Sequence, residues 1–222
     1  MANEVHHEVG LGRGDITAFQ PGIGMMGYGI VGNDVHRIET RLLCRAFVVR
    51  EIATQAVLWY AVCDMCFPTP AVVKEVRRRL QRAHPELPIH SANLVLTAQH
   101  THSGPGGYSH HALYNISVPG FVPEVIERIV AEIVSAFNQA YTDLQPAKLR
   151  YAEGAFPDHI PIAFNRSMEA HLQNPEAAGR SSEDTHLAID RTMRLLRIDH
   201  PAGTPRAMIN WYGLHATSLH ND

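Results

Sequence analysis

The sequence has few cysteines, no long apolar run and nearly balanced charges, and each of these features argues against a class of protein. Its 222 residues include three cysteines, an odd and low number that argues against a disulfide framework. No apolar run approaches the roughly 20 residues that a membrane-spanning helix needs. Lys and Arg number 19 against 22 Asp and Glu, so there is no basic field for nucleic acid. The hydrophobic fraction of 45% is enough for a sizeable core.

The N-terminal residues also lack the parts of a signal peptide. Residues 1–8 contain neither a basic region nor an apolar region. Taken alone, this start favours a cytoplasmic protein or a chain whose leader has been removed.

Two of the cysteines, Cys63 and Cys66, form a C-x-x-C motif directly after the apolar run 57–62. The sequence has no second cysteine pair to complete a zinc tetrad. We interpret both residues as small buried side chains at the end of a strand. A redox or metal-binding role is the alternative.

Hydrophobic periodicity predicts the α/β class, a mixed β-sheet layered with helices, and 222 residues are enough for one large domain or two small ones. Apolar residues at helical spacing follow Pro70 and Pro123, so a helix is expected after each of these prolines. Strands are expected where apolar residues alternate or run together, at 10–17, 45–50, 57–62, 94–99, 148–154, 192–198 and 207–214. Ligand sites of open sheets usually lie at the edge where strands end.

Histidine, in contrast, is plentiful, with 15 residues. His100 ends the strand-like run 94–99 and is followed by His102 in a glycine-proline turn, while His215 ends the similar run 208–214. Neutral imidazole is a zinc ligand, and the end of a strand aims it well. We therefore expect His100 and His215 to bind a metal ion, and His102 to donate a hydrogen bond to a carbonyl oxygen or oxyanion. For each of them an ordinary hydrogen-bonded histidine is the alternative.

Two irregular segments complete the pattern. The glycine-rich segment 22–29 lacks the spacing of a nucleotide-binding loop, so it either lies across a pocket or is an ordinary series of turns. The polar stretch 164–185 is long for an irregular segment inside a compact domain, and such segments are more often functional than accidental.

Several motifs, in the right order, resemble those of the neutral/alkaline, non-lysosomal ceramidases. The signature is His-Thr-His-Ser-Gly-Pro-Gly-Gly-Tyr at residues 100–108. Further motifs that fit this family lie at 12–17, 25–28, 45–48, 165–167 and 210–218. Together they are more specific than any single one, and they extend over most of the chain.

The resemblance implies a hydrolase that uses one zinc ion to cleave the amide of ceramide (N-acylsphingosine) into a fatty acid and a sphingoid base. It implies that His100 and His215 bind the zinc, and that His102 and Arg166 bind the substrate and the developing oxyanion. The family's remaining zinc ligands, a glutamate and a tyrosine, follow the histidine that His215 matches. They are therefore expected outside this chain. The resemblance thus implies that residues 1–222 form a single domain, the N-terminal portion of the catalytic domain, which would need the missing sequence for activity.

Two alternatives stand beside this function. One is a non-catalytic, truncated relative that binds lipid or a partner, and the other is a hydrolase of another N-acyl lipid. The resemblance implies a ceramide-like lipid as the partner, with peripheral contact to a membrane. It also implies secretion, which the N-terminal residues by themselves do not indicate.

Overall fold

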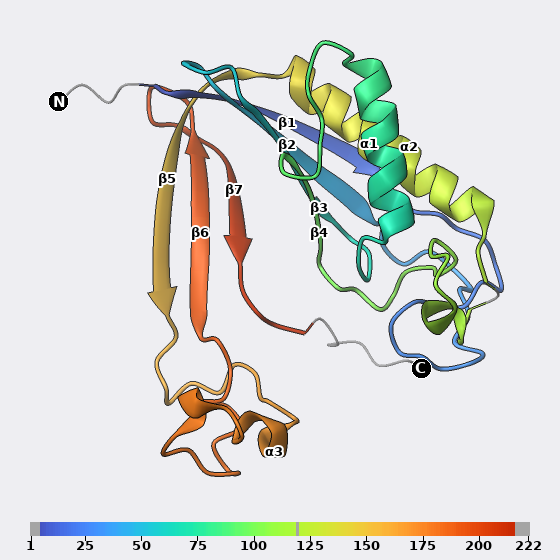
Figure 1. Ribbon diagram of the computed structural model, residues 1–222, viewed down its shortest axis with the longest axis vertical. Helices are drawn as coiled ribbons and strands as arrows, with labels where there is room; N and C mark the ends of the chain where they lie inside the picture. Colours follow the sequence, from blue (N-terminus) through green and yellow to red (C-terminus); the bar gives the residue numbers. More distant parts are fainter. Residues whose placement is uncertain (1–4, 119, 216–222) are drawn as a thin grey trace. The chain divides into compact units, whose positions relative to one another are not determined.

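Figure 1 shows the chain as a computed structural model, which describes residues 5–118 and 120–215. The contacts divide it into two compact units: unit 1 extends to Ala147, and unit 2 is Lys148–His215. The expectation of one domain over residues 1–222 stays a prediction.

Unit 1 contains four strands and the beginning of a fifth. The four are β1 (His7–Asp15), β2 (Leu43–Glu51), β3 (Val57–Cys63) and β4 (Leu94–Ala98). β1, β2 and β3 pair antiparallel, whereas β4 pairs with β3 in parallel, so the sheet is mixed. Within unit 1 the order of the strands across the sheet is β4-β3-β2-β1. A mixed sheet combined with helices confirms the predicted fold class.

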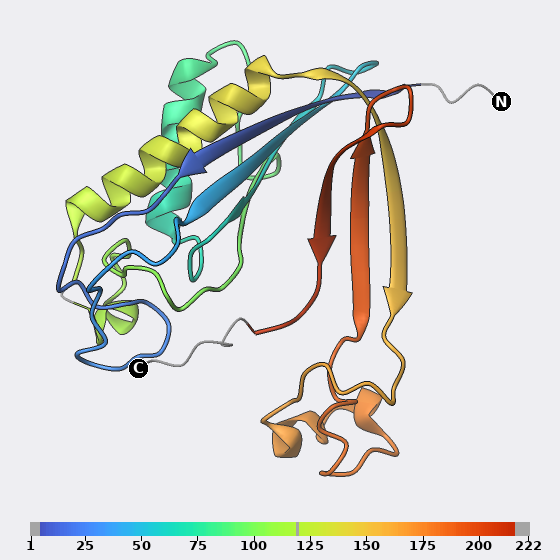
Figure 2. The same ribbon diagram turned by 180° about the vertical axis from the view of Figure 1, so that it is seen from behind.

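Both predicted helices are present, and each begins at its proline. α1 (Pro70–Ala83) starts after Thr69, whose side chain accepts a hydrogen bond from the backbone N–H of Val72 and so caps the helix. α2 (Pro123–Thr142) is the longer helix and contacts β1, β2 and α1. Figures 1 and 2 show it running along the strands with α1 beside it. The apolar stripe of each helix is buried, and together these stripes form much of the core of unit 1.

Glycines on β1 allow α2 to approach the sheet closely. A Cβ atom on Gly12 would lie 1.9 Å from the carbonyl oxygen of Ala136, and one on Gly10 would lie 1.7 Å from that of Ala140. No side chain fits at those distances, so glycine is required at both positions for this packing.

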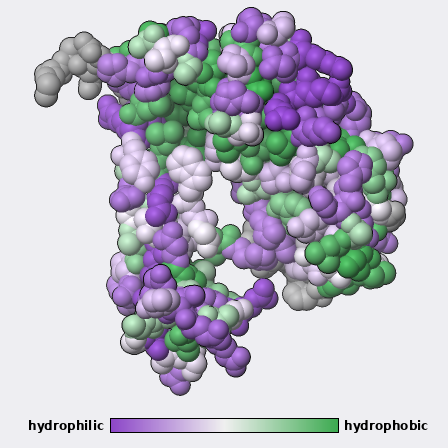
Figure 3. All heavy atoms as spheres, viewed as in Figure 1, coloured by the Kyte–Doolittle hydropathy of each residue, from purple (hydrophilic) through white to green (hydrophobic). Residues whose placement is uncertain are grey.

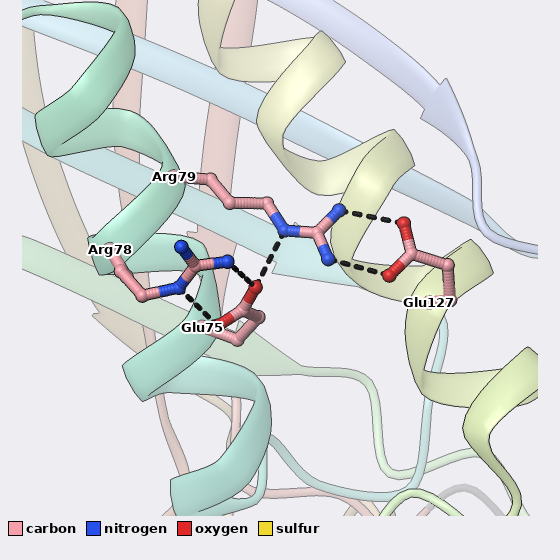
Figure 4. A network of polar contacts seen from close by, with 4 residues as sticks. All are labelled: Glu75, Arg78, Arg79 and Glu127. Carbon is pink, nitrogen blue, oxygen red and sulfur yellow. Dashed lines mark hydrogen bonds and ion pairs between the residues drawn. The ribbon is translucent and has the colours of Figure 1, made fainter.

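A charged network joins the two helices on their outer side (Figure 4). The Arg79 guanidinium donates to Glu75 on its own helix at 2.8 Å and to both carboxylate oxygens of Glu127 on α2, at 2.7 and 2.5 Å. Arg78 also donates to Glu75, at 2.7 Å from its Nε. Arg78 and Arg79 together hold the pKa of the Glu75 carboxyl down at about 2.

Unit 2 is built on an antiparallel ribbon of three strands. The first residues of β5 (Gln145–Ala155) belong to unit 1 and pair with β1. The rest of β5 belongs to unit 2 and pairs with β6 (Thr192–Asp199). β6 pairs in turn with β7 (Pro205–Trp211). The polar connection between β5 and β6 holds only the short helices α3 (Met168–His171) and η2 (Pro175–Ala177). This confirms the irregular segment that the sequence predicts.

The Arg191 side chain organises that connection. It is nine-tenths buried, and its guanidinium donates to the carbonyl oxygens of Phe156, Pro157, Ile160 and His186. One cation therefore ties both ends of the irregular segment together. Among the residues that the structure describes, no helix is long and apolar enough to span a bilayer.

Candidate functional site

The candidate site starts from His100, two residues beyond the end of β4. The backbone of His100 has φ of +58°, a left-handed conformation that is uncommon for residues other than glycine. Its Nδ1 lies 2.8 Å from the carbonyl oxygen of Cys66. Because a carbonyl only accepts hydrogen bonds, Nδ1 carries the proton and Nε2 carries the lone pair. That is the tautomer and the kind of second hydrogen bond that a metal-binding histidine requires.

His102 places a second imidazole against the first. The two Nε2 atoms are 3.3 Å apart, and the rings meet edge to face at 83°. Two nitrogens bound at 2.0–2.1 Å in a zinc tetrahedron would be about 3.3–3.4 Å apart. The distance therefore fits either of two roles for His102. It could bind the same metal ion as His100, or it could donate a hydrogen bond to a substrate atom beside that ion.

The glycine-rich segment 22–29 packs on His102. A Cβ on Gly27, where φ is +129°, would lie 2.4 Å from Cγ of the His102 ring. The ring of Tyr28 meets the same imidazole edge to face, with the centroids 4.7 Å apart. Backbone hydrogen bonds from Met26 to Gly104 and from Gly106 to Gly24 fix the segment against the glycine-proline turn. The sequence left two interpretations of this segment open, and its contacts favour a role at the site over ordinary turns.

Cys66 is the third member of the cluster. Its Sγ, His100 and His102 offer donor atoms that all lie within 4.8 Å of one another, which makes them a group able to hold a metal ion. The Cys66 sulfur, however, lies 3.5 Å from Nδ1 of His100, the nitrogen that already donates to the Cys66 carbonyl. Burial raises the pKa of the Cys66 thiol to about 11, so at neutral pH the side chain is a thiol. The Cys66 carbonyl group orients His100, and the Cys66 sulfur is a further candidate metal donor beside the two imidazoles.

The sequence analysis did not place Cys66 beside the histidines, although it predicted the burial of Cys63 and Cys66 correctly. The order of the elements along the chain could have indicated that Cys66 lies near His100. β3 and β4 are joined by α1 and pair in parallel, so the residues that follow them reach the same edge of the sheet. Cys66 follows β3 and His100 follows β4.

The other two predicted site residues, Arg166 and His215, belong to unit 2. Arg166 is exposed. The residue before it, Asn165, donates from its backbone N–H to the Thr185 carbonyl and from its side chain to the Ala188 carbonyl. The residue after it, Ser167, donates from its N–H to the Asn165 side chain. His215 is exposed and follows the end of β7. The convergence of His100 and His215 on one ion stays a prediction. Residues 216–218 of the motif around His215 lie outside the described residues.

Comparison with known proteins identifies the lineage. The family described as "Neutral/alkaline non-lysosomal ceramidase, N-terminal" matches residues 7–222. The neutral ceramidase of Pseudomonas aeruginosa is 37% identical over 220 residues, which is 99% of this chain and 32% of that protein. The neutral ceramidase of Mycobacterium tuberculosis is 34% identical over 215 residues, 96% of this chain and 32% of that protein.

Solved structures give the same result. One is described as a ceramidase complexed with C2, with a TM-score of 0.88, 37% identity, and coverage of 98% of this chain and 32% of that one. Another is a crystal structure of the neutral ceramidase from Pseudomonas aeruginosa, also with a TM-score of 0.88 and 37% identity, covering 98% of this chain and 33% of that one. This chain thus spans about a third of the length of the curated relatives it matches. It belongs to the neutral/alkaline non-lysosomal ceramidase family and corresponds to its N-terminal part.

Proposed function

We propose that this chain supplies part of the active site of a zinc-dependent amidase that cleaves ceramide into a fatty acid and a sphingoid base. The observation that carries the proposal is the 3.3 Å approach of the His100 and His102 Nε2 atoms, with the tautomer of His100 set by the Cys66 carbonyl. The relatives named neutral ceramidase support the choice of ceramide as substrate.

The residues have distinct roles in this proposal. His100 and His215 hold the zinc, and its remaining ligands come from outside this chain. The chemistry that zinc supplies in such sites is Lewis-acid polarisation of a carbonyl and activation of water near neutral pH. The donor chemistry of His100 fits this ion, because its Nε2 carries the lone pair and its Nδ1 is hydrogen-bonded.

His102 acts on the substrate. It is buried and held by Gly27 and Tyr28, so its ring needs no reorganisation when a substrate arrives. Its Nε2 lies beside Nε2 of His100, where it donates a hydrogen bond to the amide oxygen as negative charge develops. Arg166 adds a permanent positive charge for the same oxygen or for the polar head of the lipid.

Zinc binding tests the metal assignment. We expect purified chain loaded with zinc to lose the ion in His100→Gln and to bind it more weakly in His215→Gln, measured by elemental analysis after dialysis. His36→Gln is the matched control, because His36 is exposed and belongs to unit 1 like His100. Stoichiometric zinc in the double variant His100→Gln/His215→Gln would contradict the ligand assignment.

Hydrolysis tests the reaction. Fatty-acid release from a short-chain ceramide is measured with and without added zinc, for this chain alone and for this chain joined to the remaining part of the Pseudomonas aeruginosa relative. We expect zinc-dependent release from the joined protein, reduced in His102→Ala and Arg166→Ala. Release from other N-acyl lipids but not from ceramide would assign a different substrate. No release from any of them would favour the non-catalytic alternative.

A further inference from the structure

A charge-free stretch of sequence surrounds the histidine pair. Residues 87–123 contain no Asp, Glu, Lys or Arg, although 18% of the whole chain is charged. The second half of this stretch is the 107–122 loop, of which the structure describes every residue but 119. Its two ends are joined by a 2.7 Å hydrogen bond from the Val122 N–H to the Gly107 carbonyl. A compact surface loop with its ends tied together in this way is typical of functional Ω-loops.

The tip of this loop exposes large apolar side chains. It carries the short helix η1 (Ala112–Asn115), and around it Leu113 is 72% exposed, Ile116 is 69% exposed and Tyr114 is partly exposed. Figure 3 shows hydrophobic atoms gathered at the place where Figure 1 draws η1. Soluble surfaces carry single apolar residues, but a cluster of large ones on an uncharged loop marks an interaction site.

The tip is rigid where it meets the candidate site. The ring of Tyr114 packs on Phe67 with the centroids 4.7 Å apart, and Phe67 directly follows Cys66, the residue that orients His100. The Asn115 side chain donates to the Ser109 carbonyl at 2.9 Å, which fixes the base of η1. The loop therefore presents its apolar tip at a defined position beside the histidine pair.

A second loop adds to the same side. Its backbone at Gly24 packs on the 107–122 loop so closely that a Cβ would lie 2.4 Å from the Ser117 carbonyl. This loop carries Ile30 and Val31 at its own tip, with Val31 78% exposed. It is closed by hydrogen bonds between Ile23 and Val35 and between Met25 and Asn33.

We propose that the tip residues Leu113, Tyr114 and Ile116, with Ile30 and Val31 of the neighbouring loop, insert into the surface of a lipid bilayer. This rests on the proposed function, because ceramide has two hydrocarbon chains and resides in membranes. Aliphatic side chains with a tyrosine and no charge match the boundary between head groups and acyl chains. A charged loop would be repelled from hydrocarbon or attracted only to anionic lipid. The tip thus brings the histidine pair to the layer that holds the substrate.

Vesicle binding tests this surface without depending on hydrolysis. The whole chain, without added zinc, is sedimented with phosphatidylcholine vesicles that contain no ceramide. We expect binding that survives a rise in salt concentration, because it rests on apolar insertion and not on charge. We expect Leu113→Asp and Ile116→Asp each to weaken binding about tenfold or more, since each loses the burial of one large side chain.

Two further variants complete the design. Val31→Asp tests the neighbouring loop and is expected to weaken binding. Met208→Asp is the control, because Met208 is also a large apolar side chain, 63% exposed, but belongs to unit 2. Thermal unfolding of each variant checks that it folds. Three results would overturn the proposal: the wild-type chain does not bind vesicles, the loop variants bind as well as the wild type, or high salt abolishes binding. So would a wild-type chain that self-associates and becomes monomeric in Leu113→Asp, because the tip would then be a protein interface.

Failure of this proposal is distinct from failure of the amidase proposal. Vesicle binding without hydrolysis leaves the surface assignment standing, and hydrolysis of dispersed short-chain ceramide without vesicle binding leaves the enzyme standing.

Discussion

At the scale of single residues, the imidazoles of His100 and His102 are held by two different segments of the chain. The Cys66 carbonyl fixes the His100 ring, and the backbone of Gly27 with the ring of Tyr28 encloses His102. Rigid surroundings of this kind preorganise a site, because the side chains already have their working orientation before a ligand arrives.

Gly27→Ala tests the enclosure of His102. The new methyl group would overlap the imidazole, and the backbone at Gly27 has a conformation that disfavours alanine. We expect the free energy of unfolding to fall by about 2–5 kcal/mol, from overpacking and backbone strain together. Chemical denaturation measures it.

Gly29→Ala is the control, because Gly29 also has a positive φ but would place its Cβ in open space. We expect a loss of only about 1–2 kcal/mol there. Equal losses in the two variants would show that contact with His102 contributes nothing.

The residues of the site were predictable only in part. The motif at 100–108 placed His100 and His102 in the site, because their order in the sequence carries that information. Their 3.3 Å approach was not predictable, since it depends on a left-handed backbone at His100 and on a loop that comes some 75 residues earlier in the chain.

At the scale of elements, α1 and α2 are joined by the ion pairs of Arg79. The pKa of Glu75 is about 2, below its ordinary value of 4.5. A carboxyl whose pKa is lower in the folded state stabilises the fold above its unfolded pKa and loses that effect as pH falls through the folded pKa. The contribution of Glu75 is therefore present above about pH 4.5 and is lost between there and about pH 2.

Glu75→Gln tests this assignment. We expect its thermal midpoint to change less than that of the wild-type chain over this acidic range, because the titrating group has been removed. Glu176→Gln serves as the control, since Glu176 is exposed and makes no ion pair among the described residues. If the thermal midpoint of Glu75→Gln depended on pH as steeply as that of the wild-type chain, the role of this network would be contradicted.

The irregular segment of unit 2 depends on Arg191. Arg191→Met removes the guanidinium donor from the carbonyl oxygens of Phe156, Pro157, Ile160 and His186, of which Pro157 keeps the backbone N–H of Ile160. We expect a loss of about 2–4 kcal/mol in the free energy of unfolding, because several hydrogen bonds to a charged group disappear together. Hydrogen exchange should accelerate over residues 157–190.

Arg180→Met, which alters an exposed arginine of the same segment, should leave the exchange unchanged. Acceleration confined to the β-strands in Arg191→Met would show that Arg191 supports the ribbon and not the segment that carries Arg166.

The elements themselves were largely predictable. A predicted strand overlaps each strand of the described residues, although β1 and β7 begin and end two to three residues earlier than predicted. The prolines at 70 and 123 marked the first residue of each long helix. β5 (Gln145–Ala155) is longer than the predicted strand 148–154, because its first residues pair with β1. Such pairing is made by backbone hydrogen bonds, which leave no pattern in the side chains.

At the scale of the whole molecule, the proposed zinc ligands come from both units: His100 from unit 1 and His215 from unit 2. A ligand that binds only the folded chain stabilises it by about 2.7 kcal/mol at a hundred times its Kd. We therefore expect zinc to raise the melting temperature of the wild-type chain and to slow hydrogen exchange in both units.

His215→Gln should confine any remaining slowing to unit 1, and His36→Gln should behave as wild type. Slowing confined to unit 1 in the wild-type chain itself would mean that His215 does not share the ion with His100.

The glycines of β1 also fix an order of events during synthesis. Among the strands of unit 1, β1 leaves the ribosome first, yet the surface it covers belongs to α2, the last helix of that unit to be made. β2 is made next and pairs with β1 along its whole length, but the glycine-rich face of β1 stays uncovered until α2 has been made. A translation intermediate that stops before Pro123 would therefore contain the β1–β2 pair with one open face that is poor in side chains.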